Sequence, residues 1–504
     1  MSAVRATNSP ETYPAETPGT TPGTTKQIPT GNSFGARFDR YFSITERGST
    51  GRRELRGGIA TFFTMAYIVV LNPLILSSSA DSTGAKLSGP AIATVTALVA
   101  AVMTVLMGVY GRYPFALAAG LGINGVVAFQ LAPQMTWAGA MGIVVLEGLA
   151  ITLLVLTGLR ELILDAIPLA LKQSISVGIG LFIAFIGFVD SGFVRRSESG
   201  TPVGLGIGNR LMGWPTIVFA LGLLLGVVLV ARRVPGAILL TLIGGTAFAI
   251  VLQLFVDVPA AAGAANSTGW ALNVPAVPDK IIGSPDFSLL GNFSLRDAFS
   301  IGVISALLAV FTLMLADFFD TMGTVVGVGA EGGLLDSDGR LPGVNRVLLV
   351  DSLAAVAGGA ASSSSNTTYI ESASGVGEGA RTGVASLVTG ALFLLAIPFT
   401  PLVTVVPYEA ASPVLVIVGF LLMTQVRDIP WNDYDLAIPA FLTIVLMPFT
   451  YSITNGIGAG FIAFVAIKAA KGKWREPGIL LWVVSLLFVI YFAIDPVEQA
   501  LGVK

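Results

Sequence analysis

Two aspartates three residues apart stand inside a long apolar run. Asp317 and Asp320 belong to the stretch Ala316–Thr324, which reads ADFFDTMGT. Residues with this spacing share one face of a helix. Carboxylates in an apolar span are expensive to bury, and they commonly mark a substrate or ion pathway. The alternative is that one aspartate only caps or braces a neighbouring helix, although this explains a single acid better than a pair.

A third acid, Glu371, and an amide, Asn124, stand in two segments that small and polar residues interrupt. The first segment, Pro114–Gly125, reads PFALAAGLGING, and the second, Ser362–Gly375, reads SSSSNTTYIESASG. Irregular backbone leaves N–H groups unpaired in lipid, so it must be buried in protein or line a cavity. We expect two half-helices that meet near the midplane, each preceded by a short extended stretch.

The glycines of these segments would let a flat ligand approach the backbone, namely Gly120, Gly122 and Gly375. Asn124 and Glu371 would then supply directed hydrogen bonds. The alternative is that the small residues only allow close helix packing. For Asn124 the sequence favours neither interpretation over the other.

Histidine and cysteine are both absent from the 504 residues. Disulfides, thiolate or imidazole metal sites and histidine proton relays are therefore excluded. A carboxylate buried away from cations can take up a proton on one side of a membrane and release it on the other. The leading candidates are Asp317, Asp320 and Glu371. Glu147, alone in its apolar run, is either a further carrier or an internal brace.

The elements that must hold these residues are membrane spans. The chain has a mean hydropathy of +0.82, with 54% hydrophobic and only 12% charged residues, about half the charge of a typical soluble protein. Its apolar residues fall in repeated runs of about 17–25, the length that crosses a bilayer. A net charge of −2 without a basic stripe argues against nucleic-acid binding. We therefore expect a lipid-embedded protein with a small-molecule partner.

The apolar runs predict an all-α polytopic membrane protein with fourteen transmembrane segments. Because each half holds seven, the second half enters the membrane in the opposite sense, which is typical of inverted-repeat transporters. The interrupted segments are the third and tenth. The predicted divisions are a disordered and basic tail (1–50), the first repeat (51–256), an extracellular connection (257–298), the second repeat (299–475) and a C-terminal apolar segment and tail (476–504). Residues 478–494 either span the membrane or lie at its surface.

Basic residues indicate the orientation, because short loops rich in Lys and Arg stay in the cytoplasm. Placing the arginines of 37–56 inside also places most other basic loops inside, up to the cluster at 468–475. Arg195, Arg196 and Arg210 are exceptions in one outer loop. The sequence therefore predicts a multi-pass protein of the cell membrane with a cytoplasmic N-terminus.

Five short motifs, which include the segments described above, give the chain a resemblance to a known family. The chain resembles the AzgA-like adenine/guanine/hypoxanthine permeases from about Arg52 to Arg475, and the likeness is most specific in the last two of five motifs. The motifs are 61–73 (TFFTMAYIVVLNP), 120–124 (GLGIN), 178–183 (GIGLFI), 317–324 (DFFDTMGT) and 369–376 (YIESASGV).

The resemblance implies a proton-coupled purine nucleobase symporter, not an enzyme, with the fold of the uracil and xanthine permeases and separate core and gate domains. It implies substrate contacts at Asn124, Asp317 and Glu371, and a coupling role for Asp320. After Asn124 this chain has Gly125-Val-Val where Ala-Tyr-Phe is usual, so an aromatic contact with the base is missing or supplied elsewhere.

The chemistry of the residues suits a purine. A carboxylate such as Glu371 can accept two hydrogen bonds from adjacent N–H groups, and an amide offers both a donor and an acceptor. Phe318 and Tyr369 are near enough in sequence to stack on the ring, although packing explains either aromatic equally well.

No cofactor is expected besides the proton, and homodimerisation is left open. The main alternative is a sulfate- or bicarbonate-type anion transporter on the same architecture, which three carboxylates would disfavour unless they were protonated.

Overall fold

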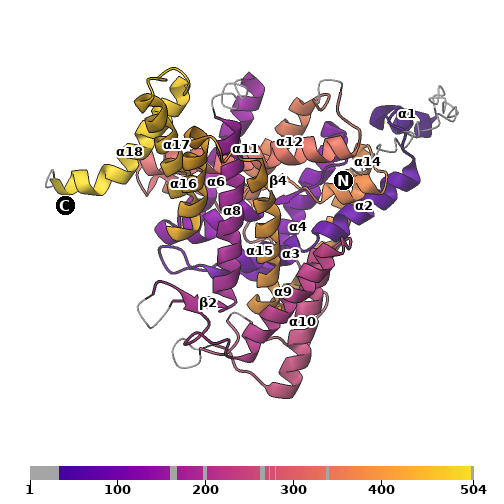
Figure 1. The fold of residues 1–504 in the computed structure, drawn as a ribbon. Helices are drawn as coiled ribbons and strands as arrows, with labels where there is room; N and C mark the ends of the chain where they lie inside the picture. The colour runs from indigo at the N-terminus through magenta and orange to yellow at the C-terminus, as the bar shows by residue number, and fades with distance from the viewer. Residues whose placement is uncertain are drawn as a thin grey trace, which may run out of the picture.

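A computed structural model describes residues 33–158, 167–196, 201–261, 267–271, 273–278, 280–336 and 340–500, without the side chains of 494–500. In this part the chain is mainly helical, and its strands form two short antiparallel pairs. The disorder predicted for residues 1–32 lies outside the described residues. From Ser33 onward the predicted tail is folded, because helix α1 (Phe34–Phe42) occupies part of it at the edge of the molecule (Figure 1).

Long helices make up most of both halves. Those of the first half are α2 (Gly51–Met65), α3 (Ile68–Ser78), α4 (Gly89–Leu106), α6 (Trp137–Thr157), α8 (Leu169–Asp190), α9 (Trp214–Ala231) and α10 (Ala237–Val256). Those of the second half are α11 (Val303–Glu331), α12 (Val344–Ala360), α14 (Gly383–Ala396), α15 (Tyr408–Met423), α16 (Tyr434–Phe449), α17 (Ile453–Ala470) and α18 (Ile479–Ala500).

Ten helical segments of the described chain are long and apolar enough to cross a membrane. The protein is thus a multi-pass membrane protein. The other segments of the predicted fourteen are the shorter helices α12 and α16 and the two interrupted segments. A total of fourteen therefore stays a prediction.

An extended strand followed by a short helix occupies each interrupted segment. In the first, β1 (Leu117–Ala119) precedes α5 (Leu121–Val126), and in the second, β4 (Asn366–Thr368) precedes α13 (Ser372–Gly377). The two strands pair antiparallel, with Leu117 opposite Thr368 and Ala119 opposite Asn366. The pairing supplies backbone partners where neither segment is helical, as a low-dielectric environment requires.

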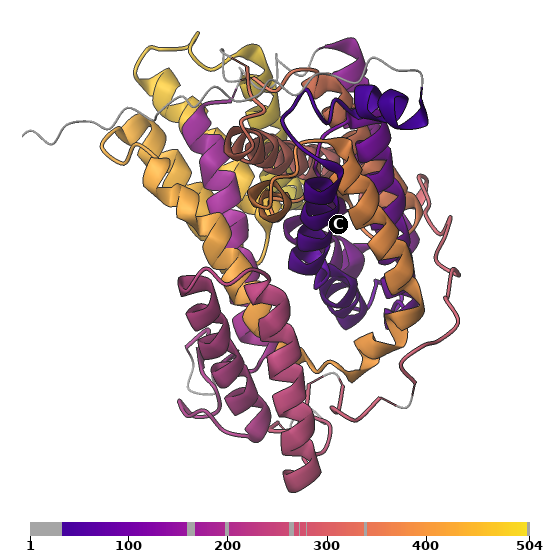
Figure 2. The ribbon, with the colours of Figure 1, turned by 90° about the vertical axis from the view of Figure 1, so that its right-hand side faces the viewer.

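The long helices form two groups that lie side by side in Figure 2. In the α8 bundle, α8 packs against α15 and α16, α17 packs on α16, and α9 and α10 pack on each other and on α15. In the α6 bundle, α6 packs against α11 and α12, α3 packs on α4, and α2 and α4 pack against α14. The paired strands belong to the α6 bundle, where they contact α4, α11 and α12.

Glycine allows the closest helix crossing in the α8 bundle. Gly180 on α8 and Gly419 on α15 face each other so closely that a Cβ on either would collide with the other's carbonyl oxygen. Small residues at such crossings are typical of membrane helices, where van der Waals packing stabilises association. The glycines of the GIGLFI motif therefore have a packing role.

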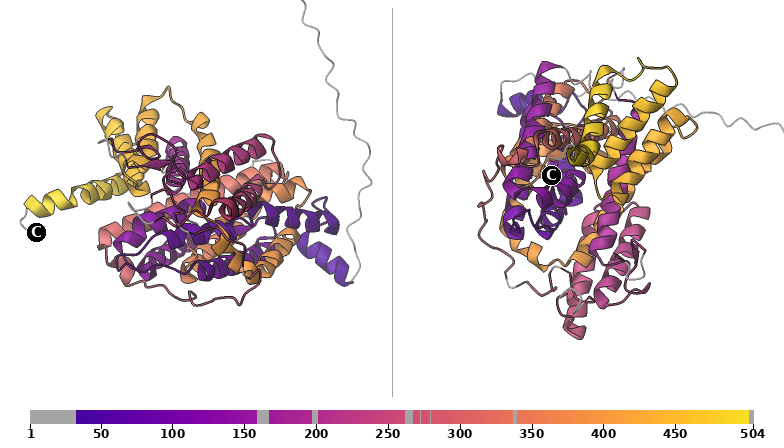
Figure 3. Two further views of the ribbon diagram at one scale, coloured as in Figure 1. Left: turned by 90° about the horizontal axis from the view of Figure 1, so that it is seen from below. Right: turned by 90° about the vertical axis from the view of Figure 1, so that its left-hand side faces the viewer.

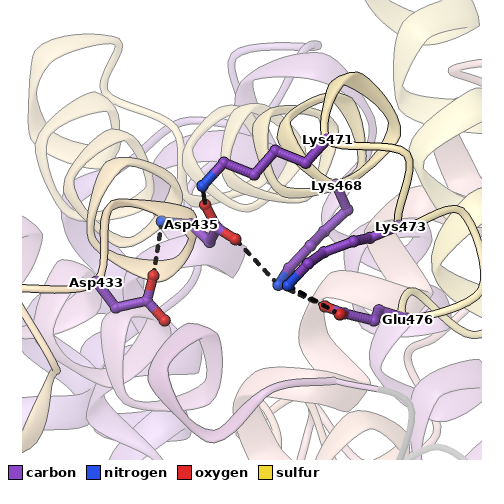
Figure 4. Close-up of polar contacts among 6 residues, drawn as sticks. All are labelled: Asp433, Asp435, Lys468, Lys471, Lys473 and Glu476. Carbon is purple, nitrogen blue, oxygen red and sulfur yellow. Dashed lines mark hydrogen bonds and ion pairs between the residues drawn. The ribbon is translucent and has the colours of Figure 1, made fainter.

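A group of charged residues joins α16, α17 and the segment before α18 (Figure 4). The buried ammonium of Lys468 lies 3.3 Å from Asp435 and 2.6 Å from Glu476, and Lys471 forms a second ion pair with Asp435. The hydrogen bonds from Lys468, and then from Lys473, lower the pKa of the Glu476 carboxyl. These contacts hold the start of α18 beside α17.

Helix α18 packs at its start and then leaves the body of the protein (Figures 1 and 3). Phe488 is fully buried against Phe461 of α17, where the absence of a side chain at Gly458 makes room for its ring. The apolar helix predicted at 478–494 thus exists, and the question of whether it spans the membrane stays open.

Glu54 fixes α2 against the start of α14. Its side chain is fully buried, and its two oxygen atoms accept hydrogen bonds from the backbone N–H groups of Arg381, Thr382 and Ala385 at 2.9–3.3 Å. A carboxylate at a helix N-terminus satisfies donors that the helix itself leaves free. This contact joins two distant parts of the sequence inside the α6 bundle.

We predict that Glu54→Ala lowers the thermal midpoint of the detergent-solubilised protein clearly, because each buried N–H group left without an acceptor costs about 1–3 kcal/mol. Glu378→Ala is the matched control: it removes an exposed ion pair with Arg56, which is worth about 0–1 kcal/mol. Equal midpoints for the two variants would contradict this assignment. Intrinsic fluorescence during heating measures the difference.

Candidate functional site

A small cavity lies between the two bundles, beside the first interrupted segment. Its volume is about 30 Å³, enough for water but far below the roughly 300–1,000 Å³ of small-molecule pockets. The α8 bundle contributes one wall and the α6 bundle the other. The lining residues are Gly120, Gly122, Ile123, Ser176, Ile179, Ala316, Asp320 and Leu422.

A larger cavity of about 900 Å³ lies beside the hairpin of β2 (Val194–Arg195) and β3 (Gly204–Leu205). It is lined by the ends of helices of the α8 bundle, including Asp190 and Glu409, and contains none of the predicted site residues. The smaller cavity, in contrast, is lined by Gly120, Gly122 and Asp320, which the sequence analysis singled out. We therefore place the candidate site at the smaller cavity, which both bundles share.

Gly122 and Asn124 lie on α5, directly after the extended strand. Gly122 lines the cavity, where its backbone is accessible as predicted. Ile179 of α8 lies against it, at the position that a side chain would otherwise occupy. Asn124 is fully buried, and neither its amide nitrogen nor its amide oxygen has a hydrogen-bond partner among the described residues. Buried polar groups are rarely left unpaired, so this amide is well suited to bind a ligand.

Glu371 is the residue directly before α13, on the other side of the strand pair, and its side chain makes no hydrogen bond to the start of that helix. The hydroxyl of Tyr67, a buried residue just before α3, donates a hydrogen bond of 2.5 Å to Glu371 Oε1. A carboxylate has about four acceptor positions, so Oε2 remains able to accept from a ligand. Tyr67 lies in the first familiar motif, but the sequence alone suggested no role for it.

The two aspartates of α11 face different surroundings although they share one side of the helix. Asp320 reaches the cavity wall and accepts a hydrogen bond from Thr367 of β4 at 3.4 Å. Asp317 is fully buried behind the strand pair, where Ser365 contacts it at 3.4 Å. The structure thus places Asp320 on the cavity wall and Asp317 away from it.

The two predicted aromatic contacts are engaged with protein. The hydroxyl of Tyr369 donates to the carbonyl of Ala119 in β1, which strengthens the strand pairing. The ring of Phe318 makes an edge contact with Phe319, with 5.9 Å between centroids. Stacking of either ring on a ligand stays a prediction.

One expectation about glycine is wrong. Gly375 does not present backbone to the cavity, because it packs against α2, where a Cβ would collide with Thr61 and with the carbonyl of Gly57. Here the small residue serves close helix packing. Sequence spacing cannot distinguish this from a ligand-facing glycine, since both require only the absence of a side chain.

Sequence reasoning missed Asp351 on α12. It is buried, and its Oδ1 accepts hydrogen bonds from the backbone N–H and the hydroxyl of Thr368 at 2.8 and 2.7 Å, while Oδ2 accepts from Thr321 at 2.8 Å. It therefore ties strand β4 to α11 and α12. A signal existed, because a carboxylate inside an apolar run is itself unusual.

Comparison with known proteins gives the family. The model of the permease family (Xan_ur_permease) matches residues 52–458. The chain belongs to this permease family. It is 38% identical over 466 residues to the guanine/hypoxanthine permease PbuG of Bacillus subtilis (strain 168), covering 90% of this chain and 98% of PbuG. It is 34% identical to the adenine permease AdeQ of Escherichia coli (strain K12), covering 90% and 95%.

Membership in the permease family confirms the resemblance read from the motifs, and it makes the protein a transporter and not an enzyme. Solved structures agree on the fold. The transmembrane domain of the cyanobacterial bicarbonate transporter BicA superposes with a TM-score of 0.55 at 16% identity, covering 81% of this chain and 97% of BicA's domain. SLC26A9 gives 0.55 at 11% identity, covering 84% and 65%. The permease thus has the fold of these inverted-repeat transporters.

We predict that Asp351→Ala destabilises the permease, because it leaves the Thr368 N–H and two buried hydroxyls without an acceptor, at about 1–3 kcal/mol for each unpaired group. Asp351→Asn keeps one acceptor oxygen and should fall between this variant and the unchanged protein. Ser352→Ala is the control, since the Ser352 hydroxyl bonds only within its own helix, to Leu349. A thermal midpoint for Asp351→Ala equal to that of the control would show that the tie is unimportant.

Proposed function

We propose that this permease imports purine nucleobases, namely adenine, guanine and hypoxanthine, by proton symport. Relatives named as guanine/hypoxanthine and adenine permeases match nearly their whole length, which supports this substrate class. The observation that carries the proposal is the pair of polar groups around the strand pair. Within the described part of the chain the buried amide of Asn124 has no hydrogen-bond partner, and Glu371 is oriented by Tyr67 with one oxygen left for a ligand.

A purine matches this pair chemically. Its adjacent N–H groups can donate to the carboxylate of Glu371, while the amide of Asn124 offers a donor and an acceptor to another edge. The backbone at Gly120 and Gly122 leaves room for a flat ring once the cavity opens. The site residues remain Asn124, Glu371, Asp317, Phe318, Tyr369 and Gly122 for the substrate, and Asp317, Asp320 and Glu371 for the proton.

Transport by alternating access requires the cavity to open. In the present conformation Ile179 and Leu422 of the α8 bundle close it to about 30 Å³, so a base enters only when the bundles separate on one side. In this proposal the α6 bundle is the core domain and the α8 bundle the gate domain. The protein lies in the cell membrane as fourteen segments with its N-terminus in the cytoplasm.

Anion transport is the competing function, because the fold is shared with a bicarbonate transporter. A likeness at 16% identity concerns the fold alone. The carboxylates around the cavity would repel an anion unless they were protonated. The sequence relatives and the site chemistry both favour the nucleobase.

The decisive measurement is uptake of labelled adenine, guanine, hypoxanthine and uracil by cells that lack their own nucleobase permeases. We expect purine accumulation that a proton uncoupler abolishes, and little uptake of uracil. Purine uptake no higher than that of cells with the empty vector would refute the proposal. Purine accumulation that is insensitive to the uncoupler would refute proton symport but leave purine import standing.

Substitution of Glu371 tests whether this residue binds the purine. Glu371→Gln should abolish purine uptake, because the amide replaces an acceptor oxygen with a donor that opposes the purine N–H groups. Glu378→Gln, a neutralised glutamate seven residues further on that is partly exposed, should keep uptake. Equal uptake by the two variants, at matched amounts in the membrane, would place the base elsewhere.

A further inference from the structure

Behind the strand pair, two carboxyl groups from different helices meet at a single hydroxyl. The Oγ atom of Ser365 lies 3.2 Å from Glu147 Oε2 on α6 and 3.4 Å from Asp317 Oδ2 on α11. All three residues are fully buried. The two carboxyl groups also lie within hydrogen-bonding reach of each other, and Glu147 Oε1 and Asp317 Oδ1 have no further hydrogen-bond partner among the described residues. Glu147 has no polar neighbour along its own helical turn, and the tertiary structure brings Ser365 and Asp317 to it.

Counting hydrogens constrains the protonation of this group. A serine hydroxyl carries one hydrogen, so it can donate to only one of two carboxylates, although its oxygen can also accept. If both acids were ionised, the second contact would join two acceptors. A proton on one carboxyl resolves this, because that acid then donates to Ser365 and Ser365 donates to the other acid.

The surrounding charges favour the same state. Further acids lie near the pair, namely Asp351 on α12 and Asp320, which stands three residues after Asp317 on α11. Among the described residues, no three acidic side chains approach closely enough to hold a metal ion. Two like charges at such short range in a buried site cannot both persist without a counterion.

We propose that Glu147 and Asp317 share one proton through the Ser365 hydroxyl and that this pair is the site where the transported proton is held. The transfer needs only small side-chain movements that shorten these two contacts to ordinary O–H···O lengths of about 2.5–3.0 Å. The Glu147 carboxyl gives its proton to Ser365 Oγ as Ser365 gives its own to Asp317 Oδ2, which leaves Glu147 ionised and Asp317 neutral. The reverse transfer restores the first state. This inference rests on the proposed proton symport and adds Glu147 and Ser365 to it.

Ser365 connects this pair to the cavity. Its carbonyl accepts a 2.8 Å hydrogen bond from the N–H of Gly120, the residue directly before α5, which lines the cavity. Ser364, the preceding residue, has φ = 68°, which is unfavourable for a residue with a side chain. The turn that carries Ser365 is thus held in a strained conformation. When the contacts of Ser365 with the two acids change, this hydrogen bond passes the movement of Ser365 to Gly120, directly before α5.

Glu147→Gln is the sharpest test, because the glutamine amide donates a hydrogen bond as a protonated glutamate would. The variant therefore mimics the proton-loaded state permanently. In proteoliposomes with an imposed pH gradient, we expect it to lose concentrative purine uptake while it keeps exchange of labelled for unlabelled purine without a gradient. Glu409→Gln, a buried glutamate at the start of α15 in the other bundle, should keep both activities.

Two further measurements complete the test. Ser365→Ala keeps both acids and the backbone carbonyl but removes the bridging hydroxyl, so it should also lose gradient-driven uptake. Infrared difference spectra between acid and alkaline pH should show a protonated-carboxyl band in the unchanged protein that Glu147→Gln removes. Concentrative uptake by Glu147→Gln equal to that of the unchanged protein, or loss of exchange in a correctly folded variant, would overturn the proposal.

The infrared band separates failure of this inference from failure of the proposed function. The carboxyl band can be measured without substrate. A band in a protein that transports no purine would therefore refute the proposed substrate and still support the shared proton. Purine transport driven by a pH gradient, with no carboxyl band that depends on Glu147, would leave the proposed function intact and remove the pair.

Discussion

The structure depends on how backbone polar groups are satisfied where the helices break. In a low-dielectric interior an unpaired N–H or C=O group costs several kcal/mol, so neither interrupted segment could exist alone. Strands β1 and β4 solve this by pairing with each other. Side chains complete the pairing at one end, where Thr104 bonds both backbone groups of Leu117 and Asp351 accepts from the N–H of the opposite residue, Thr368.

This pairing also decides where the functional groups lie. Because β1 comes from the first half of the chain and β4 from the second, their antiparallel contact brings α5 and α13 to the same region. Asn124 and Glu371, which are 247 positions apart by number (371 − 124), therefore lie in the two segments that this strand pair joins. Glu147 on α6 and Asp317 on α11 contact Ser365, directly before β4, and Asp351 on α12 contacts Thr368 at the end of β4. The proposed substrate site and the carboxyl cluster thus share one short piece of backbone.

Close packing through glycine keeps the rest of the molecule in two bodies. Gly180 and Gly419 bring α8 and α15 together in one bundle, while Gly57 and Gly375 bring α2 and α13 together in the other. In the proposed transport cycle, movement occurs at the surface between the two bundles. The cavity lies at that surface, with Asp320 on one side and Ile179 on the other.

The sequence by itself determined the class of the protein, because hydropathy, run length and the absence of histidine and cysteine are properties of composition and order alone. It also located the interrupted segments and the acids Asp317, Asp320 and Glu371, since unusual residues in apolar runs are visible without coordinates. Only the tertiary structure decided that Gly375 packs against α2, that Asp351 holds β4, and that Glu147 meets Asp317 at Ser365. These facts depend on contacts between helices far apart in the chain, and the spacing of residues along one helix carries no information about which other helix lies against it.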